Sequence, residues 1–557
     1  MQRPLSLSIN VRANAFGGRK GVDRTKVLRE PSGFLSRVDS ETSLHRERFS
    51  EKTISSLQTC SAWRKRTFRQ AESPAAAGDF VFFRCRPEKL LDRKNTPPYN
   101  ENHVFQFGEY VVMKQDSTVH NLTDGSVRRQ LTRYALPMVA ISLLQALYSM
   151  TDIIISGHFV GNVGISAINN SGQVLGIVTN IAIGVTMGGN ILISQFFGAG
   201  DQDRRKEATG TLFSLSLLLG VFGAVLLILF ARPMLVALGA PALEQACDYL
   251  NICALGLPMI FGYNALSSVL RAVGNSKTPM HIVIAATLLN VALDLLFVGP
   301  LQMGTKGAAA ATVIAQTLSF LLALLYMLRH RELFELRPRF FKIRPALTAS
   351  IFKLGIPSAL QNTIGSISWL VVTFLINSYG VDVSAGNGVA IKIKDFCQLF
   401  TAAMANSAAS MIAQTLGAKK FDRAKQVMDE TMKITLLISA GMIAIVELFT
   451  PQLVAVFTSD AKVAEAAVLN LRIEILAQVF YASFPVYNAL AIGAGHSLFA
   501  MANSFVNCIL FRVVLAVTLN HFFGIVGLYT ACMLAPAISV FLGHLYAKSR
   551  VWRRSLA

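Results

Sequence analysis

Long apolar segments dominate the chain from residue 130 onward, where twelve of them alternate with short polar connections. A helix needs about 20 apolar residues to cross the hydrocarbon core of a bilayer. The run from Ile282 to Val298 is too long for a buried strand. Only 15% of the residues are charged and the mean hydropathy is +0.47, whereas a soluble domain carries about 25% charged residues. The sequence therefore predicts an all-α integral membrane protein with twelve transmembrane helices.

The position of the charges predicts the orientation in the membrane. A net charge of +20 would suit a nucleic-acid binder, but the charges concentrate before residue 134 and in short loops. With the N-terminus inside, the inner loops and the C-terminus carry 19 Lys and Arg residues, and the outer connections carry three: Arg232, Lys306 and Lys462. This asymmetry follows the positive-inside rule. We expect a multi-pass protein of the cell (inner) membrane with both termini cytoplasmic and no nucleic-acid partner.

Residues 1–125 are interpreted as a basic cytoplasmic extension. Residues 1–112 contain 20 Lys and Arg and 12 Asp and Glu residues, without sustained apolar periodicity, so disorder is expected. The segment lacks the apolar core of a secretory signal, and its acids argue against a transit peptide. Two interpretations stay open: translation starts at Met113, or the segment is a regulatory or nucleic-acid-binding tail.

Motifs of metal centres and of intramembrane enzymes are missing from the sequence. The seven cysteines are scattered and form no C-x-x-C pair, which a structural metal site would need. The sequence contains neither H-E-x-x-H nor a G-x-S-G nucleophile. We therefore expect a non-enzymatic protein without a cofactor or a resident metal.

Three short patterns recur in the chain at an offset of 219 or 220 residues. They are A-L-P ending at Pro137 and G-I-P ending at Pro357, Q-F-F-G-A-G from Gln195 and Q-T-L-G-A-K from Gln414, and G-x-x-G from Gly304 and from Gly524. The repeat predicts two pseudo-symmetric six-helix bundles in tandem, an N-lobe at 126–340 and a C-lobe at 341–557. Because six is even, both lobes have the same topology and are related by an axis along the membrane normal.

The N-lobe motifs resemble those of the multidrug and toxic compound extrusion (MATE) family from about residue 126 to 548, most closely its DNA-damage-inducible-protein-F-like branch. The motifs are Pro137 and Asp152 on the first helix, Q-x-x-G-A ending the second, R-A-V-G-N-S-K-T-P after the fourth, and N-x-x-x-D on the fifth. The resemblance implies an antiporter, coupled to Na⁺ or H⁺, that exports amphiphilic organic cations, drugs or metabolites by alternating access. A flippase for lipid-linked or polysaccharide substrates, from a related export family, is the alternative. We expect a monomer that binds a small molecule, most simply an organic cation.

Two polar residues interrupt the apolar run LLNVALDLLF at the fifth predicted helix. Asn290 and Asp294 are spaced i, i+4 and share one helix face. A charged carboxylate in hydrocarbon costs at least about 2.5 kcal/mol, so Asp294 is expected to be protonated, to face a wet cavity or to hold a cation. A carboxylate beside a neutral oxygen donor suits Na⁺, and a lone acid suits a proton. The structural alternative is hydrogen bonding to neighbouring helices.

The resemblance implies a coupling site that contains this pair together with residues of other helices. Asp152 lies in a second apolar run, with Gln145 two turns earlier on nearly the same face. Residue by residue, the family's N-lobe cation site corresponds to Asp152, Asn264, Asn290, Asp294 and Thr312. Gln145 would line the cavity nearby.

The C-lobe does not repeat this site. The offset of 220 carries Asp294 to Val514 and Asn290 to Leu510, whereas Arg512 lies between them and could snorkel or line the cavity. A-I-K-I-K-D-F on the eighth helix supplies Lys392, Lys394 and Asp395. We expect these three either to form a salt-linked cluster facing the central cavity or to cap a helix near the interface.

Overall fold

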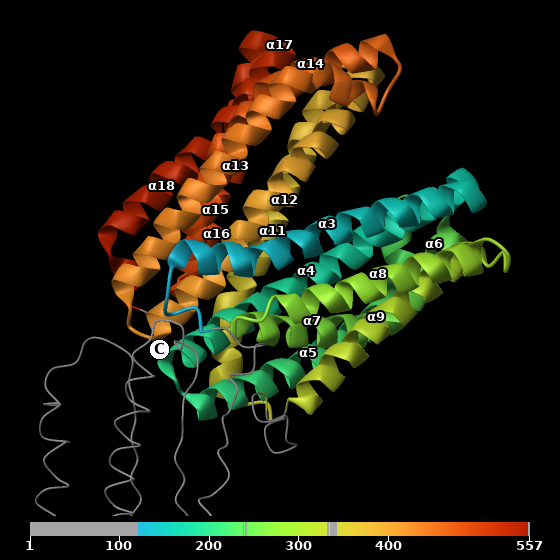
Figure 1. Ribbon diagram of the computed structural model, residues 1–557. Coiled ribbons are helices and arrows are strands. Elements are labelled where there is room, and N and C mark those ends of the chain that lie inside the picture. Colours follow the sequence, from blue (N-terminus) through green and yellow to red (C-terminus); the bar gives the residue numbers. More distant parts are fainter. Residues whose placement is uncertain (1–120, 238, 240–241, 331–333, 335–341, 555–557) are drawn as a thin grey trace, which may run out of the picture. The chain divides into compact units, whose positions relative to one another are not determined.

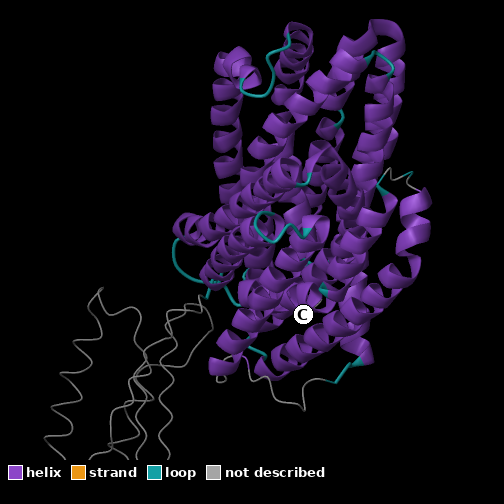
Figure 2. Cartoon of the chain, turned by 90° about the vertical axis from the view of Figure 1, so that its right-hand side faces the viewer, coloured by secondary structure: helices purple, strands orange, loops and turns teal. Residues whose placement is uncertain are grey.

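A computed structural model describes residues 121–237, 239, 242–330, 334 and 342–554. The chain divides into units of residues 1–117 and 118–557, and the description below concerns the second. The described residues form helices, turns and loops and contain no strand (Figure 2). The predictions for residues 1–120, including the start at Met113 and the expected disorder, lie outside this part of the chain.

The first half of the described chain folds into six spans that lie together (Figure 1). Its helices are α3 (Val127–Phe159), α4 (Gly161–Ala199), α5 (Gln202–Ala237), α6 (Leu243–Leu255), α7 (Leu257–Ala272), α8 (Lys277–Val298) and α9 (Gly304–Arg329). Helices α6 and α7 form one span that bends by 48°. Pro258 lies in the first turn of α7 and has no backbone N–H to donate to the carbonyl oxygen of Ala254, so the hydrogen-bond ladder of α6 ends there.

The second half repeats this order of helices. They are α11 (Pro345–Asn377), α12 (Val381–Gly417), α13 (Phe421–Ala455), α14 (Ala461–Glu474), η3 (Ile475–Ala477), α15 (Gln478–Gly493), α16 (Ser497–Phe505), the π-helix η4 (Val506–Val513), α17 (Val514–Leu534), α18 (Pro536–Ser549) and η5 (Val551–Arg553). The 3₁₀ segment η3 interrupts the span formed by α14 and α15. This interruption corresponds in position to the break between α6 and α7 in the first half. Gly304 and Gly524, which are 220 residues apart, have φ of 58° and 60°, which glycine adopts without steric cost.

These helices account for the predicted number of spans. Within the described residues, nine helices are long and apolar enough to cross a membrane, and the bent pair α6–α7 makes ten. The helical stretch Ser497–Ser549 contains two spans that meet at Gly524, and α3, which carries the first predicted span, completes the twelve. Large apolar side chains such as Leu370, Phe374 and Leu448 are 70% to 76% exposed, as expected for surfaces that face lipid. The predicted all-α membrane fold is confirmed.

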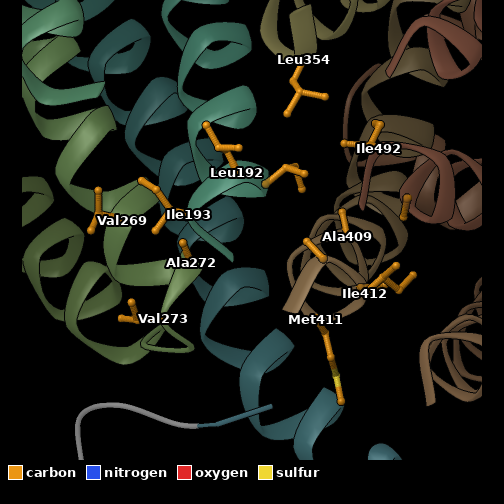
Figure 3. Packing of buried hydrophobic residues seen from close by; sticks show 14 of the residues in the cluster. Leu192, Ile193, Val269, Ala272, Val273, Leu354, Ala409, Met411, Ile412 and Ile492 are labelled. Atoms are coloured by element: carbon orange, nitrogen blue, oxygen red, sulfur yellow. The ribbon is translucent and has the colours of Figure 1, made fainter. Parts of the chain in front are cut away.

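The two halves pack on each other through α4, which contacts α11 and α12. Gly188 permits this approach, because a Cβ there would lie 2.4 Å from the carbonyl oxygen of Ile351. Buried apolar side chains from both halves, including Leu192 and Leu354, form one cluster at this contact (Figure 3). Small residues thus allow close helix packing here, as glycine does between membrane helices generally.

Candidate functional site

The acids predicted for the N-lobe lie on neighbouring helices. Asp152 is seven residues before the end of α3, and Asp294 is four residues before the end of α8, and these two helices contact each other. Asp152, Asn290 and Asp294 are 8%, 1% and 1% exposed. The two carboxylates are close enough to interact electrostatically. The structure thus brings together two acids that are 142 positions apart in the sequence.

These buried polar groups have few partners. Both carboxylate oxygens of Asp294, both amide atoms of Asn290 and Oδ1 of Asp152 are buried without a hydrogen-bond partner among the described residues. Burying a polar group without a hydrogen bond costs free energy. A bound cation, a proton or water would interact with these unpaired polar atoms. This cluster therefore has the chemistry of a site for small cations.

Tyr148 links this cluster to α9. Its hydroxyl lies 3.0 Å from Oγ1 of Thr312, and it is within electrostatic range of both Asp152 and Asp294. Thr312, which the resemblance placed in the cation site, is therefore connected to the acids through a tyrosine. Sequence reasoning missed Tyr148, although it precedes Asp152 by four residues and shares its helix face by the same spacing that linked Asn290 to Asp294.

The other two predicted N-lobe residues are less closely associated with the acids. The amide nitrogen of Asn264 donates to the carbonyl oxygen of Ile260 in its own helix at 2.8 Å. Gln145 is exposed. Tyr249 and Cys253 of α6, which the sequence did not indicate, are within electrostatic range of Asp152. The acids are therefore bordered by α6 as well as by α3 and α8.

The C-lobe contains a different buried network. Val514 and Leu510, the positions equivalent to the acid and the amide of α8, are 56% and 49% exposed, so the N-lobe cluster is not duplicated. Instead the Nζ of Lys394 pairs with the carboxylate of Glu474 and donates to Oδ1 of Asn470 at 3.2 Å. Asn470 in turn donates to Asn387 at 3.1 Å.

This network corrects the predicted cluster of Lys392, Lys394 and Asp395. Lys394 pairs with Glu474 rather than with Asp395, because successive residues on a helix point about 100° apart. Lys392 is exposed, and Asp395 lies on the wall of a cavity in the C-lobe. Sequence alone gave no sign that Glu474, 80 positions away, would face Lys394.

Arg512 is buried in the same lobe rather than snorkelling. It is 2% exposed and lies in the π-helix η4, a distortion that recurs at functional sites. Its Nη2 donates to the hydroxyl of Tyr481 at 2.9 Å, and its guanidinium carbon lies 4.8 Å from the ring centre of Trp369. Its Nε and Nη1 have no hydrogen-bond partner in the part of the chain that the structure describes.

The two copies of the Q-x-x-G pattern lie at one end of the contact between the lobes. Gln195 donates to the carbonyl oxygen of Gly493 at 2.9 Å, and Gln414 donates to that of Ala272 at 2.6 Å. A Cβ at Gly198 would lie 1.9 Å from the carbonyl oxygen of Gln414, and one at Gly417 would lie 2.0 Å from that of Gln195. Each copy of the pattern thus packs against the other copy.

Residues 121–125, which the sequence places in the disordered extension, are fixed to the C-lobe at this same end. The guanidinium of Arg423 donates to the carbonyl oxygens of Leu122, Asp124 and Gly125 at 2.7 to 3.2 Å. Lys420 pairs with Asp124 at 2.6 Å. Partners some 300 positions away thus hold this short polar segment in place.

Comparison with known proteins agrees with this architecture. The sequence model of the MatE family matches residues 137–296 and again 357–518, two segments that begin 220 residues apart, as the repeat predicts. The chain is 26% identical over 440 residues to the probable multidrug resistance protein YoeA of Bacillus subtilis, covering 77% of this chain and 95% of the relative. It is 26% identical over 441 residues to the probable multidrug resistance protein NorM of Thermotoga maritima, covering 77% and 94%.

A solved structure shares the fold. It is described as the outward-facing conformation of a multidrug resistance MATE family transporter, and it aligns with a TM-score of 0.74 at 21% identity over 77% of this chain and 97% of that one. The helix order, the repeat and the matched segments together make the protein a multi-pass membrane transporter rather than an enzyme. The chain belongs to the MatE family of multidrug efflux transporters.

Proposed function

We propose that the protein is an antiporter that exports amphiphilic organic cations by alternating access, in exchange for Na⁺ or H⁺ bound in the N-lobe. The coupling site comprises Asp152, Asn264, Asn290, Asp294 and Thr312. The observation that carries the proposal is the buried carboxylate of Asp294, whose two oxygens lack hydrogen-bond partners among the described residues. An acid inside a membrane protein is stable when it is protonated or holds a cation, and an acid that alternates between occupants couples two fluxes.

Both coupling ions suit parts of this site. The amide of Asn290 and the hydroxyl of Thr312 supply neutral oxygens, which hard cations bind together with carboxylates. Two neighbouring acids also suit proton exchange, because like charges at close range titrate as a pair. The multidrug resistance named for both bacterial relatives supports drug-like substrates.

Dye efflux from vesicles tests the proposal. The purified protein is reconstituted, loaded with a cationic dye and given either a Na⁺ gradient or a pH gradient of equal driving force. We expect one gradient to accelerate efflux and the dissipation of that gradient by an ionophore to abolish the acceleration. Efflux that responds to neither gradient would exclude cation-coupled antiport.

We further propose that the protein works as a monomer in the cell membrane with both termini cytoplasmic. The support is the excess of Lys and Arg in the loops assigned to the inner side. A cysteine replacing Glu335 should resist a membrane-impermeant thiol reagent applied to intact cells. Rapid labelling at that position would reverse the proposed orientation.

A further inference from the structure

Residues 121–125, here called the N-strap, run directly into α3 of the N-lobe and are held by the C-lobe. The guanidinium of Arg423, in the first turn of α13, donates to three N-strap carbonyl oxygens and to Oε1 of Gln130 in α3, the last at 2.8 Å. The backbone N–H of Leu122, a residue that is 2% exposed, donates to Oε1 of Gln414 at 3.2 Å. The N-strap is therefore a bridge between the two lobes.

The second repeat contains a counterpart of the N-strap. Lys342 follows Leu122 by 220 positions, and its carbonyl oxygen accepts a hydrogen bond from the hydroxyl of Thr211 in α5 at 3.3 Å. Arg344 pairs with Glu207 of the same helix at 2.7 Å, and both side chains are partly exposed. The first helix of each lobe is thus preceded by residues that the third helix of the other lobe holds.

The repeated glutamines show that the two attachments differ in strength. Oε1 of Gln414 accepts a hydrogen bond from the N-strap, whereas Oε1 of Gln195, 219 positions earlier, is buried without a hydrogen-bond partner among the described residues. Leu122 is buried, whereas its counterpart Lys342 is exposed. The N-strap therefore contributes more to holding the lobes together than the residues before α11 do.

The covalent connection leaves α3 little freedom while the N-strap is bound. Only Gly125 and Ser126 lie between Asp124 and the start of α3, and two extended residues add at most about 7 Å of reach. Helix α3 contacts α12 and α13 of the C-lobe as well as α8 of its own lobe. A larger separation of α3 from α13 requires the N-strap to leave the C-lobe.

We propose that the N-strap is a latch of the transport cycle. It keeps the lobes closed at the end where the two Q-x-x-G copies meet, and it must detach from the C-lobe before that end can open. Arg423 is the positioning residue of the latch, because it contacts both the N-strap and Gln130 of α3. The inference rests on the proposed alternating access and identifies the contact that controls one of its steps.

The first measurement reports closure and needs no transport. The hydroxyl of Ser407 in α12 is buried and donates to the sulfur of Met138 in α3 at 3.2 Å, so a cysteine in place of Ser407 reports whether the lobes separate. The full-length chain, with its native cysteines replaced by alanine, is placed in lipid nanodiscs. Arg423→Gln should raise the rate at which Ser407→Cys reacts with a thiol reagent by about tenfold, the change that about 1.4 kcal/mol produces.

Arg129→Gln is the matched control for this measurement. It removes the same charge from an exposed position on α3 and should change the labelling rate by less than about twofold. A chain that starts at residue 126 lacks the N-strap and should react as fast as Arg423→Gln, whereas a chain that starts at Met113 should react like the complete protein. Equal rates in Arg423→Gln and Arg129→Gln would overturn the assignment of Arg423.

A reversible crosslink decides whether the N-strap must detach during export. Asp124→Cys/Lys420→Cys places two thiols where the ion pair lies, and a bismaleimide with a disulfide in its spacer joins them. We expect the crosslink to block dye efflux from vesicles and a reductant that cleaves the spacer to restore it. The control is Asp201→Cys/Arg204→Cys, a pair three positions apart within the N-lobe, whose efflux should be equal before and after crosslinking.

The outcomes separate this inference from the proposed function. Efflux that continues unchanged after the N-strap is crosslinked would show a static attachment and overturn the latch. Absence of efflux before crosslinking in every variant would count against the proposed antiport. In that case the labelling of Ser407→Cys still decides whether Arg423 holds the lobes closed, because it measures separation of the lobes without a substrate.

Discussion

The hydroxyl of Ser410 donates to Oδ1 of Asn190 at 2.8 Å, and the two residues are 220 positions apart, the same offset that separates Pro137 from Pro357. Equivalent residues of two repeats can touch each other only near the axis that relates the repeats. The pseudo-two-fold axis therefore passes between α4 and α12 at this hydrogen bond. The amide nitrogen of Asn190 also donates to the carbonyl oxygen of Ser268 at 3.0 Å, which fixes the contact to α7.

Two glycines at the contact between the repeats should resist substitution. Gly198→Ala and Gly417→Ala each place a methyl group about 2 Å from a backbone oxygen of the other repeat, and overpacking of this kind costs about 1–3 kcal/mol. Thermal unfolding in detergent should show a lower Tm for both variants. Gly176→Ala in α4 and Gly388→Ala in α12 meet open space and should leave the Tm unchanged or slightly raised. Equal effects in all four would mean that the close approach is unimportant.

Neutralising the buried acid of α8 should abolish coupling while preserving the fold. Asp294→Asn keeps the size of the side chain and removes a costly buried ionisable group, so abundance should hold. Gradient-driven export should fall by at least about tenfold, the factor that a 1.4 kcal/mol loss in ion binding gives. Efflux and abundance are measured together, with the exposed Asp382→Asn as control.

The neighbouring acid should influence the pH dependence of transport. Because Asp152 and Asp294 interact electrostatically, we expect them to titrate as a coupled pair. Asp152→Asn should shift the pH profile of the remaining export, whereas a purely structural role would lower export equally at every pH.

Normal export by Asp294→Asn at normal abundance would remove the basis of the proposed coupling.

His496, in the turn between α15 and α16, should make stability depend on pH. Burial lowers its pKa, an effect that Lys353 reinforces and a backbone hydrogen bond to Arg554 opposes. The folded protein therefore binds a proton less readily than the unfolded chain. The stability is fully present above the unfolded pKa of about 6.5 and is lost as the pH falls through the lower folded value.

The measurement compares Tm at about pH 7.5 and about pH 5.5, which span the titration of histidine. His496→Gln should show a smaller fall in Tm on acidification than the unsubstituted chain. His158→Gln changes an exposed histidine and should retain the full fall. A fall that is unchanged in His496→Gln would assign the pH dependence to other groups.

Deletion of residues 1–112 should leave insertion and efflux intact. The segment lacks apolar periodicity, and the relative from Bacillus subtilis aligns over 95% of its own length while matching 77% of this chain. Membrane fractionation and dye efflux of the truncated chain provide the check. A truncated protein that inserts but does not transport would show that the segment takes part in export.

The spans, the repeat and the buried N-lobe acids were predictable because each leaves a local trace in the sequence. A carboxylate such as Asp294 is conspicuous within a long apolar run, and its i, i+4 spacing from Asn290 can be counted in the sequence. The pairing of Lys394 with Glu474 has no such trace, since its two side chains come from different helices. The same holds for Gln195, whose acceptor on Gly493 is 298 positions away. Contacts of this kind depend on how the helices pack, and pattern alone does not reveal the packing.

The lengths of α4 and α12 determine where the Q-x-x-G contact lies relative to the lipid. The two helices contain 39 and 37 residues, so α4 spans roughly 58 Å, nearly twice the roughly 30 Å of bilayer hydrocarbon. With α4 centred in the bilayer, Gly198 would lie roughly 27 Å from the midplane, at the level of headgroups and water. The Lys420–Asp124 ion pair at that end is then exposed to dissolved salt, which screens charges over about 8 Å at physiological ionic strength. Ionic strength and anionic headgroups, rather than acyl chains, would govern how readily this end of the protein opens.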